Sequence, residues 1–336
     1  MNTLIGLFII AVGSFGQSSS YVPIKKVKDW SWESFWLTQG IFAWLIFPLL
    51  GALLAVPSGS SLWQILSVDT SAALKAMLYG VLWGVGGLTF GLSMRYLGVA
   101  LGQSIALGTC AAFGTLIPAI MEGTNLFQGK GLVLLIGVCI TLAGIFIIGY
   151  AGSLRAKNMS EEDKKKAIKD FALKKGILVA LLCGVMSACF ALGLKAGEPL
   201  VVDGMSELFL TLPATLMVTL GGFLTNAVYC LYQNSKNKTF GDYGKTSLYV
   251  NNLLFCALAG ILWYSQFFGL SMGKSYLASN SVMLAFSWCI LMSLNVTFSN
   301  VWGILLKEWK GVSKATIWIL LTGLAILIFS LIYPNL

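Results

Sequence analysis

FGLSM, at residues 90–94, returns at residues 268–272, and Tyr-Leu follows each copy within a few positions. Each copy ends the third apolar segment of its half of the chain. A match of five residues is weak evidence in a chain rich in Leu and Gly, but the equivalent placement strengthens it. The repeat predicts an internal duplication, which is how many membrane transporters are built.

The composition is that of a membrane protein. Of the 336 residues, 57% are hydrophobic and 10% are charged, and the mean hydropathy is +0.83. A soluble domain carries about 25% charged residues. The net charge of +9 does not indicate a nucleic-acid partner, because Lys and Arg lie in the short loops between apolar segments. With no His and no closely spaced Cys pair, we expect no metal site and no cofactor.

Apolar runs of about 20 residues, each long enough to cross a bilayer as a helix, recur along the chain. The alternation typical of a membrane β-barrel is absent from the sequence. We therefore predict an all-α integral membrane protein. Its ten spans are expected at residues 3–22, 34–56, 73–95, 98–121, 130–151, 176–196, 207–232, 248–272, 278–305 and 315–334.

A polar segment divides these spans into five and five. We expect a first five-helix repeat at 1–152, a cytoplasmic linker with an amphipathic helix at 153–175, and a second five-helix repeat at 176–336. Spans two and seven each have one Pro, Pro48 and Pro213, that we expect to kink the span interior. An odd number of spans per repeat gives the halves opposite orientation, so the repeats are predicted to be inverted.

The distribution of basic residues predicts the orientation. The loops after spans 1, 3, 5, 7 and 9 share one side of the membrane. They hold all of the 22 Lys and Arg except Lys75, Lys130, Lys195 and Lys274. Because cytoplasmic loops are rich in Lys and Arg, that side is predicted to be cytoplasmic, with both termini periplasmic. The glycines spaced by four, Gly80/Gly84, Gly87/Gly91 and Gly98/Gly102, predict close helix packing.

Neutral polar and aromatic side chains inside the spans suit a neutral, polyhydroxylated solute. Amides and hydroxyls can pair with its hydroxyl groups, and Trp or Tyr rings can stack on its C–H faces. An anionic substrate would favour Lys or Arg in mid-membrane, and the sequence places none there. The predicted substrate-binding residues are Gln17, Tyr21, Gln39, Trp44, Trp83, Gln103, Tyr264, Gln266, Asn280 and Trp288. Many such residues serve only as interfacial anchors or interhelical contacts.

Ion coupling has the weakest signal in the sequence. A proton symporter usually needs a group in its pathway that changes protonation. No acid lies in the middle of a predicted span. Glu33 and Glu198 lie near span ends, where they are candidates for proton coupling or ordinary solvated acids.

Several motifs resemble the bacterial L-rhamnose–proton symporters. They are the stretch from Tyr21 to Glu33 (YVPIKKVKDWSWE), Leu92–Gly98 (LSMRYLG), Trp263–Phe268 (WYSQFF), Ser287-Trp288 and Leu306–Trp309 (LKEW). The resemblance runs through nearly the whole chain and keeps the order of the motifs.

This resemblance implies the drug/metabolite transporter superfamily, ten helices in two inverted repeats, and a central cavity formed by helices one to four and six to nine. It also implies import of L-rhamnose, or a related 6-deoxyhexose, together with a proton. The family pattern has an Asp and a His around the Ser-Trp pair, and residues 284–292 contain neither. The exact sugar and the coupling ion, proton or another cation, therefore stay open.

The leading interpretation is a sugar importer of a bacterial cytoplasmic membrane that works by alternating access. The alternatives are a metabolite or drug exporter of the same fold, a sugar facilitator without ion coupling, and a sugar sensor that does not transport. An enzyme is disfavoured, because a membrane hydrolase or transferase needs a metal cluster, an acid pair or an activated nucleophile.

Overall fold

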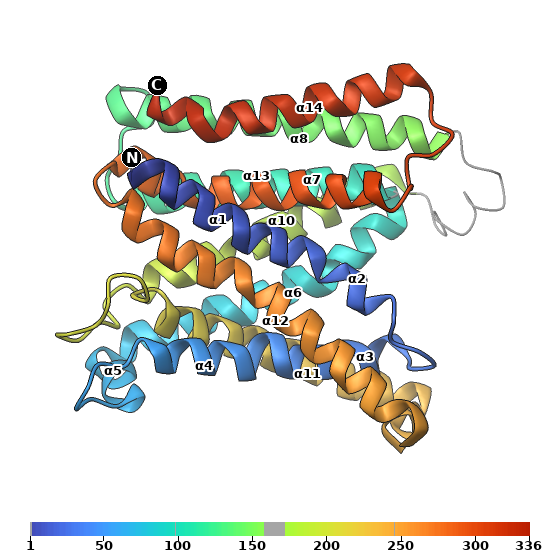
Figure 1. Ribbon diagram of the computed structural model, residues 1–336, viewed down its shortest axis with the longest axis horizontal. Helices are drawn as coiled ribbons and strands as arrows, with labels where there is room; N and C mark the ends of the chain where they lie inside the picture. The colour runs from blue at the N-terminus through green and yellow to red at the C-terminus, as the bar shows by residue number, and fades with distance from the viewer. Residues whose placement is uncertain (1, 98, 158–171, 245) are drawn as a thin grey trace. The chain divides into compact units, whose positions relative to one another are not determined.

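The computed structural model describes residues 2–97, 99–157, 172–244 and 246–336 (Figure 1). Within these ranges the chain forms helices and no strand. Ten helical segments among the described residues are long and apolar enough to cross a membrane, which confirms the predicted all-α membrane fold. The predicted linker helix falls largely on residues 158–171, which lie outside the described ranges.

The spans match the predicted ones closely, but some helices run further. α6 continues to Leu97 and α12 to Leu277, so both FGLSM copies lie inside a helix rather than at its end. The helices are α1 (Asn2–Ser19), α2 (Tyr21–Ile24), α3 (Trp32–Gly40), α4 (Phe47–Leu54), α5 (Leu62–Val68), α6 (Thr70–Leu97), α7 (Val99–Met121), α8 (Gly129–Lys157), α10 (Leu173–Ala196), α11 (Leu212–Asn237), α12 (Thr246–Leu277), α13 (Ser281–Leu305) and α14 (Lys314–Ile332), with the π-helix η1 (Ile41–Ile46) and the 3₁₀ helices η2 (Phe240–Gly244) and η3 (Tyr333–Asn335).

The seventh span begins later than predicted. α11 starts at Leu212, so Pro213 occupies its first turn instead of the interior of a span. The first turn tolerates Pro because its N–H groups have no partner within the helix. The prediction that Pro213 kinks the span interior is therefore wrong. The sequence analysis also did not predict α5, a short helix that begins at a capping box formed by Ser61 and Gln64.

The chain folds into two compact units, and each unit takes spans from both halves of the sequence. Unit 1 comprises Met1–Thr3, Val85–Leu192 and Leu277–Leu336, and unit 2 comprises Leu4–Gly84 and Gly193–Tyr276. α6 contributes its last part to unit 1 and its first part to unit 2. Each five-span half is thus distributed over both units.

In unit 1, α14 lies along α8, and α7 and α13 pack beside them (Figure 1). Buried aliphatic side chains of α8, α13 and α14 fill the space between these helices: Ile145, Ile148, Ala151, Val296, Leu320, Leu324 and Leu327. At one end, Arg155 pairs with Glu308 at 3.5 Å, and the backbone N–H of Ala172 donates to the carbonyl of Tyr96. The loops after spans three, five and nine therefore meet at this end of unit 1.

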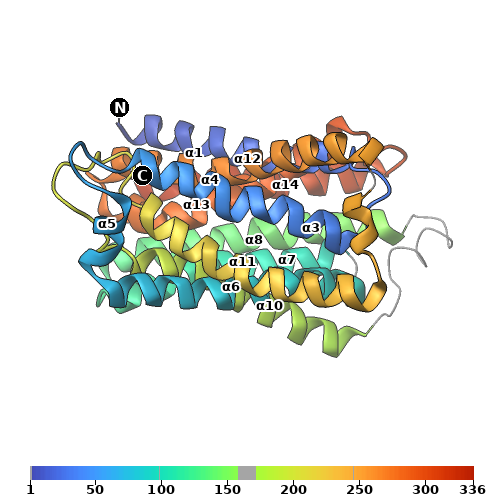
Figure 2. The same ribbon diagram turned by 90° about the horizontal axis from the view of Figure 1, so that it is seen from below.

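In unit 2, α11 packs against α3 and α4, and Figure 2 shows α3 and α4 as one continuous rod joined through η1. At one end, the backbone N–H of Ser31 donates to Asp242 at 2.8 Å, and that of Lys28 donates to Asn252 at 3.0 Å. The loops after spans one and seven therefore share this end. Each unit, taken by itself, gathers its basic loops at one end of its helices, as the span count predicts.

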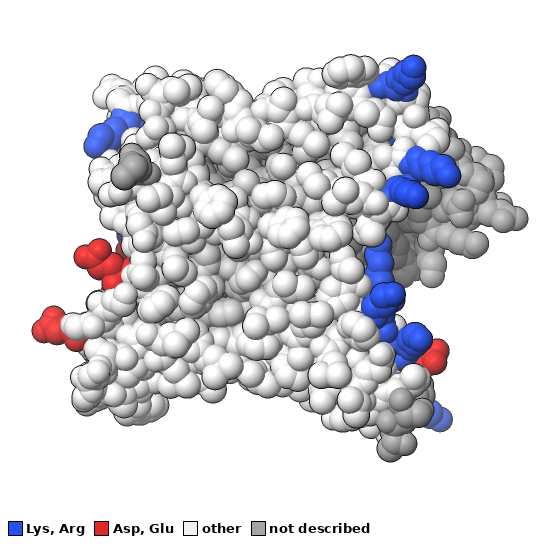
Figure 3. Space-filling model, in the orientation of Figure 1, with Lys and Arg blue, Asp and Glu red and all other residues white. Residues whose placement is uncertain are grey.

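Charged side chains keep to the helix ends. On the face shown in Figure 3, the sides of the helices carry no Lys, Arg, Asp or Glu, and the coloured side chains lie at their ends. An apolar lateral surface is what a helix needs in the hydrocarbon core, where an unpaired charge is costly.

Glycine spacing produces close packing at one of the predicted pairs. A Cβ at Gly80 would overlap the carbonyl of Val218, and one at Gly84 would lie 2.7 Å from Thr225 Cβ, so α6 and α11 approach closely. A Cβ at Gly87 or Gly91 would meet nothing within 4 Å, so the packing prediction is wrong there. Gly102 packs against the Ser93 carbonyl of α6, whereas Gly98 lies outside the described residues.

This difference predicts opposite effects for two small substitutions. Gly80→Ala should destabilise the protein by about 1–3 kcal/mol, since the added methyl meets backbone rather than a movable side chain. Gly91→Ala should be neutral, or stabilising by up to about 1 kcal/mol, because Ala favours the helix and the methyl enters open space. Thermal unfolding of the purified variants measures both. Equal effects would contradict the assigned α6–α11 contact.

Candidate substrate-binding site

The second span contains a wide helical turn that presents Trp44. Pro48 has no N–H to donate to the carbonyl of Trp44, four residues earlier, and its ring would crowd that carbonyl in a regular helix. The backbone adopts a π-helix over η1 instead, and α4 resumes at Phe47. Gly40 leaves room for the indole, because a Cβ there would lie 2.6 Å from the Trp44 ring. Such π-turns are frequent at functional sites.

Three other indole rings of unit 2 meet the ring of Trp44. We call Trp36, Trp44, Trp83 and Trp263 the tryptophan cluster. Trp44 packs edge-to-face against the other three, with ring centroids 5.4 Å from Trp36, 5.9 Å from Trp83 and 6.1 Å from Trp263. Trp83 and Trp263 are 5.8 Å apart. The cluster unites four elements, α3, η1, α6 and α12, so it forms only when the chain is folded.

Two contacts with α11 hold the cluster in place. Trp36 Nε1 donates to Asn226 Oδ1 at 2.9 Å, and Asn226 Nδ2 donates to the carbonyl of Gly222 at 2.8 Å. Gly222 also leaves space for Trp83, because a Cβ at this position would overlap the Trp83 ring. The rings are therefore fixed before any ligand arrives.

Three buried polar atoms on or beside the second span have no hydrogen-bond partner within the described part of the chain. They are Gln39 Oε1, Trp44 Nε1 and Tyr264 OH, on side chains that are 4%, 4% and 5% exposed. Buried polar atoms are nearly always paired, so such orphans call for an explanation. Together they offer an acceptor, a donor and a group that does both, which matches the hydroxyl groups of a sugar.

These atoms are spread along the span. A Cβ at Gly51 would overlap the Tyr264 hydroxyl, which places that hydroxyl beside α4. Gly51 lies seven positions after Trp44, roughly 10 Å at 1.5 Å per residue, and Gln39 lies five positions before it. One monosaccharide would therefore reach Trp44 and only one of the other two groups at a time.

The contacts of the other predicted residues of unit 2 give less support to a role in sugar binding. Gln266 Nε2 donates to the carbonyl of Trp263 in its own helix at 3.0 Å. Gln17 is partly buried and accepts from the Ser18 hydroxyl at 3.2 Å. Tyr21 begins α2 and is half exposed, and no ring contact joins it to the tryptophan cluster in the described structure.

Three predicted residues belong to unit 1. Trp288 is buried, stacks on Phe190 at 5.8 Å and donates from Nε1 to the carbonyl of Cys110 at 3.3 Å. Asn280 is the N-cap of α13, where its side chain accepts from the backbone N–H of Met283. Gln103 is partly buried on α7. The Trp288 N–H and the Asn280 amide already make hydrogen bonds within the protein.

The two candidate acids differ in their surroundings. Glu33, in the first turn of α3, is 6% exposed, and its Oε1 accepts from Asn237 and Thr239, each at 2.9 Å. Its position at a helix N-terminus also favours a negative charge. Glu198 has a half-exposed side chain that forms an ion pair with Lys195. Only Glu33 is thus held inside the protein.

A polar network around Glu33 was not predicted from the sequence. Ser34 donates to Asn234 Oδ1 at 2.9 Å, and the Thr239 hydroxyl lies 2.9 Å from the same atom. Trp36 was missed as well. Its signal was the four-residue spacing from Trp32, which stacks the two rings on one helix face at 5.5 Å.

Comparison with known proteins shows similarity along nearly the whole chain. Residues 1–333 match the family described as L-rhamnose-proton symport protein. The chain is 34% identical to the L-rhamnose-proton symporters of Yersinia pestis (strain Pestoides F) and Yersinia pseudotuberculosis serotype O:1b (strain IP 31758), over 98% of this chain and 97% of each relative. The chain therefore belongs to the L-rhamnose-proton symport protein family.

Proposed function

We propose that this protein imports L-rhamnose with a proton across a bacterial cytoplasmic membrane by alternating access. The observation that supports this most strongly is the trio of buried polar atoms on or beside the second span that have no partner among the described residues, in a chain that matches a rhamnose symporter family along its length. Because Gln39 Oε1, Trp44 Nε1 and Tyr264 OH have no partner among the described residues, all three are available for hydrogen bonds to a ligand.

In this proposal the sugar stacks on the tryptophan cluster and exchanges hydrogen bonds with Gln39 or Tyr264 as it moves along the second span. L-rhamnose suits such a site because it combines ring hydroxyls with a methyl group and apolar C–H faces. Gln17, Tyr21, Gln103, Gln266, Asn280 and Trp288 remain proposed contributors, with less support from their contacts.

The proposal also includes inverted repeats and the drug/metabolite transporter superfamily. The first FGLSM copy leads to Tyr96, at the end of unit 1 where Arg155 pairs with Glu308. In the second copy, Ser271 accepts from the backbone N–H of Thr211, at the end of unit 2 away from its basic loops. The first copy thus lies near the basic loops of its unit, and the second lies away from the basic loops of its unit. This difference supports an inverted orientation of the two repeats, as the odd number of spans per repeat requires.

Both termini are proposed to be periplasmic, and cysteine labelling tests this orientation. In a chain whose exposed Cys139 is replaced, Lys130→Cys should react with an impermeant maleimide added outside intact cells, and Lys236→Cys should not. Both should react after permeabilisation, which controls for accessibility. External labelling at position 236 alone would reverse the orientation.

Glu33 is the preferred candidate for proton coupling, because it is a buried acid at one end of unit 2. Glu33→Gln keeps an oxygen that can accept from Asn237 or Thr239 but removes the charge. We expect this variant to retain exchange of L-rhamnose across the membrane but to lose proton-driven accumulation. Uptake into proteoliposomes with and without an inward proton gradient measures both activities.

Glu198→Gln is the matched control, because an exposed ion pair contributes only about 0–1 kcal/mol and its acid is already solvated. It should accumulate L-rhamnose normally. Full accumulation by Glu33→Gln would remove Glu33 from the coupling mechanism.

The proposed function as a whole is tested by uptake of labelled L-rhamnose into proteoliposomes that contain the unmodified protein. We expect saturable uptake that increases with an inward proton gradient. Uptake that does not change with the proton gradient would favour a sugar facilitator without ion coupling. That alternative is consistent with the lack of Asp and His in residues 284–292. Binding without uptake would indicate a sensor. Neither binding nor uptake would overturn the assigned substrate.

A further inference from the structure

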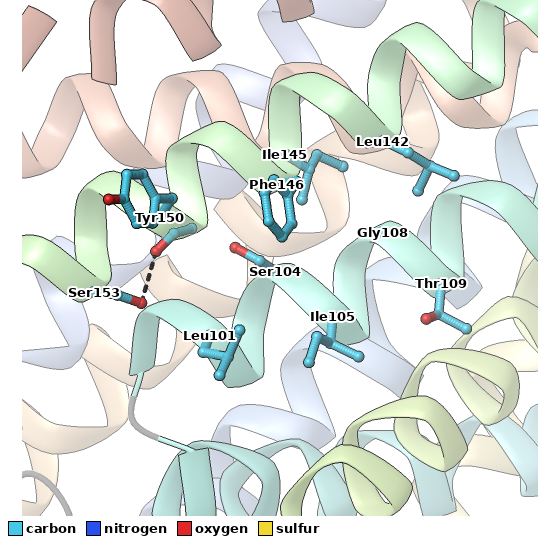
Figure 4. Close-up of a pocket in the computed structure, with 11 residues that line it drawn as sticks. Leu101, Ser104, Ile105, Gly108, Thr109, Leu142, Ile145, Phe146, Tyr150 and Ser153 are labelled. Carbon is cyan, nitrogen blue, oxygen red and sulfur yellow. Dashed lines mark hydrogen bonds between the residues drawn. The ribbon is translucent and has the colours of Figure 1, made fainter. Parts of the chain in front are cut away.

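Unit 1 contains an apolar groove between α7 and α8 with a volume of about 390 Å³ (Figure 4). Leu101 and Ile105 of α7 and Leu142, Ile145 and Phe146 of α8 form most of its wall. Gly108 also lines the groove, and a Cβ there would lie 3.2 Å from Leu142 Cδ2, so a larger side chain at this position would occupy space in the groove. None of the proposed sugar-binding residues lines this groove.

The groove opens on the outside of the protein, along a membrane span. Phe146 and Tyr150 at its edge are 68% and 52% exposed, and both belong to the span Gly129–Lys157. At this depth the surroundings are the hydrocarbon core of the bilayer, so the natural occupant is apolar.

The length of the groove corresponds to one leaflet of the bilayer. From Leu142 to Ser153 the helix rises roughly 16 Å at 1.5 Å per residue. That is about half of the roughly 30 Å hydrocarbon core. Leu142 lies near the middle of its span, and Ser153 lies near the end, so the groove reaches from mid-membrane to the interface.

Polar groups gather at the interfacial end. Tyr150 and Ser153 lie at the left of Figure 4, with Ser104 further towards the middle, while Leu142 and Thr109 lie at the other end. The last turn of α8 adds Arg155 and Lys157. Arg155 is held by Glu308 and by the ring of Trp309, 5.1 Å from its guanidinium carbon, yet its side chain remains 30% exposed.

Among the described residues at this end, the basic ones outnumber the acid. Lys307 and Lys310 flank Glu308 and are exposed, so with Arg155 and Lys157 the described side chains here carry a net positive charge. Basic side chains at the membrane surface attract anionic lipids. Charge, length and apolar walls therefore point to the same kind of ligand.

We propose that the α7–α8 groove is a binding site for an anionic phospholipid of the leaflet on the basic side. One acyl chain fills the groove from Leu142 to Tyr150, and the headgroup phosphate lies near Ser153 and Lys157. The site shares no lining residue with the proposed sugar site and does not depend on which solute is carried.

Photo-crosslinking in proteoliposomes tests this site. The probe is phosphatidylglycerol with a diazirine in one acyl chain, and the control is phosphatidylcholine with the same chain. Peptide mapping should place the phosphatidylglycerol label on Leu101–Thr109 and Leu142–Ser153 in preference to other exposed apolar positions, such as Trp318 and Ile328 of α14. The control lipid should label the groove about fivefold less, because one basic side chain near the membrane surface attracts an anionic lipid by about 1 kcal/mol.

Two variants separate the lipid site from ordinary lipid contact. Gly108→Leu should fill the groove and abolish its labelling. Lys157→Gln, at an exposed helix end, should lower the preference for phosphatidylglycerol about fivefold without disturbing the packing. Lys174→Gln, an equal charge change on α10, is the control and should leave the preference unchanged.

The proposal fails if the label spreads evenly over the exposed apolar helix faces, or if Gly108→Leu labels like the unmodified protein. It also fails if the two lipids label the groove equally. A cross-link to a second copy of this chain in place of lipid would make the groove a protein interface and would overturn the assignment.

Discussion

Trp44→Ala is expected to abolish L-rhamnose binding. Trp44 touches all three other members of the tryptophan cluster, so its removal eliminates one stacking surface and frees the other rings to move. It also deletes the unpartnered indole N–H that is proposed to donate to a sugar hydroxyl. Equilibrium binding of labelled L-rhamnose to the purified variant measures the loss.

Truncation of a buried Trp also costs about 3–5 kcal/mol of stability, so folding needs its own measurement. Trp44→Phe keeps a ring in the same space and should remain folded while binding at least about fivefold more weakly, since a lost hydrogen bond to a buried group costs about 1–3 kcal/mol. Trp63→Ala is the control, because Trp63 on α5 is 77% exposed. This variant should bind L-rhamnose normally. Normal affinity in folded Trp44→Phe would remove Trp44 from the sugar site.

Tyr264→Phe should separate stability from binding. The Tyr264 hydroxyl is buried and has no partner among the described residues, so its deletion should leave the melting temperature unchanged or raise it. If a sugar hydroxyl pairs with it during transport, the same deletion should weaken apparent L-rhamnose affinity about tenfold, in line with about 1–3 kcal/mol for a lost buried hydrogen bond. Initial uptake rates over a range of sugar concentrations measure this effect.

Tyr229→Phe is the matched control for this variant. Its hydroxyl accepts a hydrogen bond from Gln233 at 2.8 Å on a partly exposed helix face of the same unit. Its deletion should leave transport unchanged. A Tyr264→Phe protein that is less stable but transports normally would show that the hydroxyl has a structural role instead.

Hydropathy predicted the spans because each must be apolar over a membrane thickness, whatever its neighbours are. It did not predict the π-turn at η1, since a wider helical turn leaves no trace in hydropathy. It also placed Pro213 inside a span, because the apolar residues before α11 resemble the helix itself. The distribution of each half over both units depends on contacts between spans, which the pattern of one segment does not encode.

At the candidate site, too, single residues could be predicted from their own span, whereas contacts between spans could not. Trp44 and Trp83 were predictable as aromatic residues well inside their spans, and the structure brings them together at 5.9 Å. Trp36 was missed because it lies close to the predicted start of its span. The helix cap made by Asn280 could be predicted from the sequence, because Asn often precedes the first residue of a helix. The ion pair of Glu198 with Lys195 could also be predicted, because opposite charges three residues apart are neighbours on a helix.

Locating the bound sugar is the sharpest test of the proposed site around Trp44. A photoactivatable L-rhamnose analogue, activated on the purified protein and competed with unlabelled L-rhamnose, can be mapped by peptide mass spectrometry. We expect competable label on the α3–η1 segment around Gln39 and Trp44 and on α12 around Trp263 and Tyr264. Competable label confined to unit 1, for example around Trp288, would contradict it.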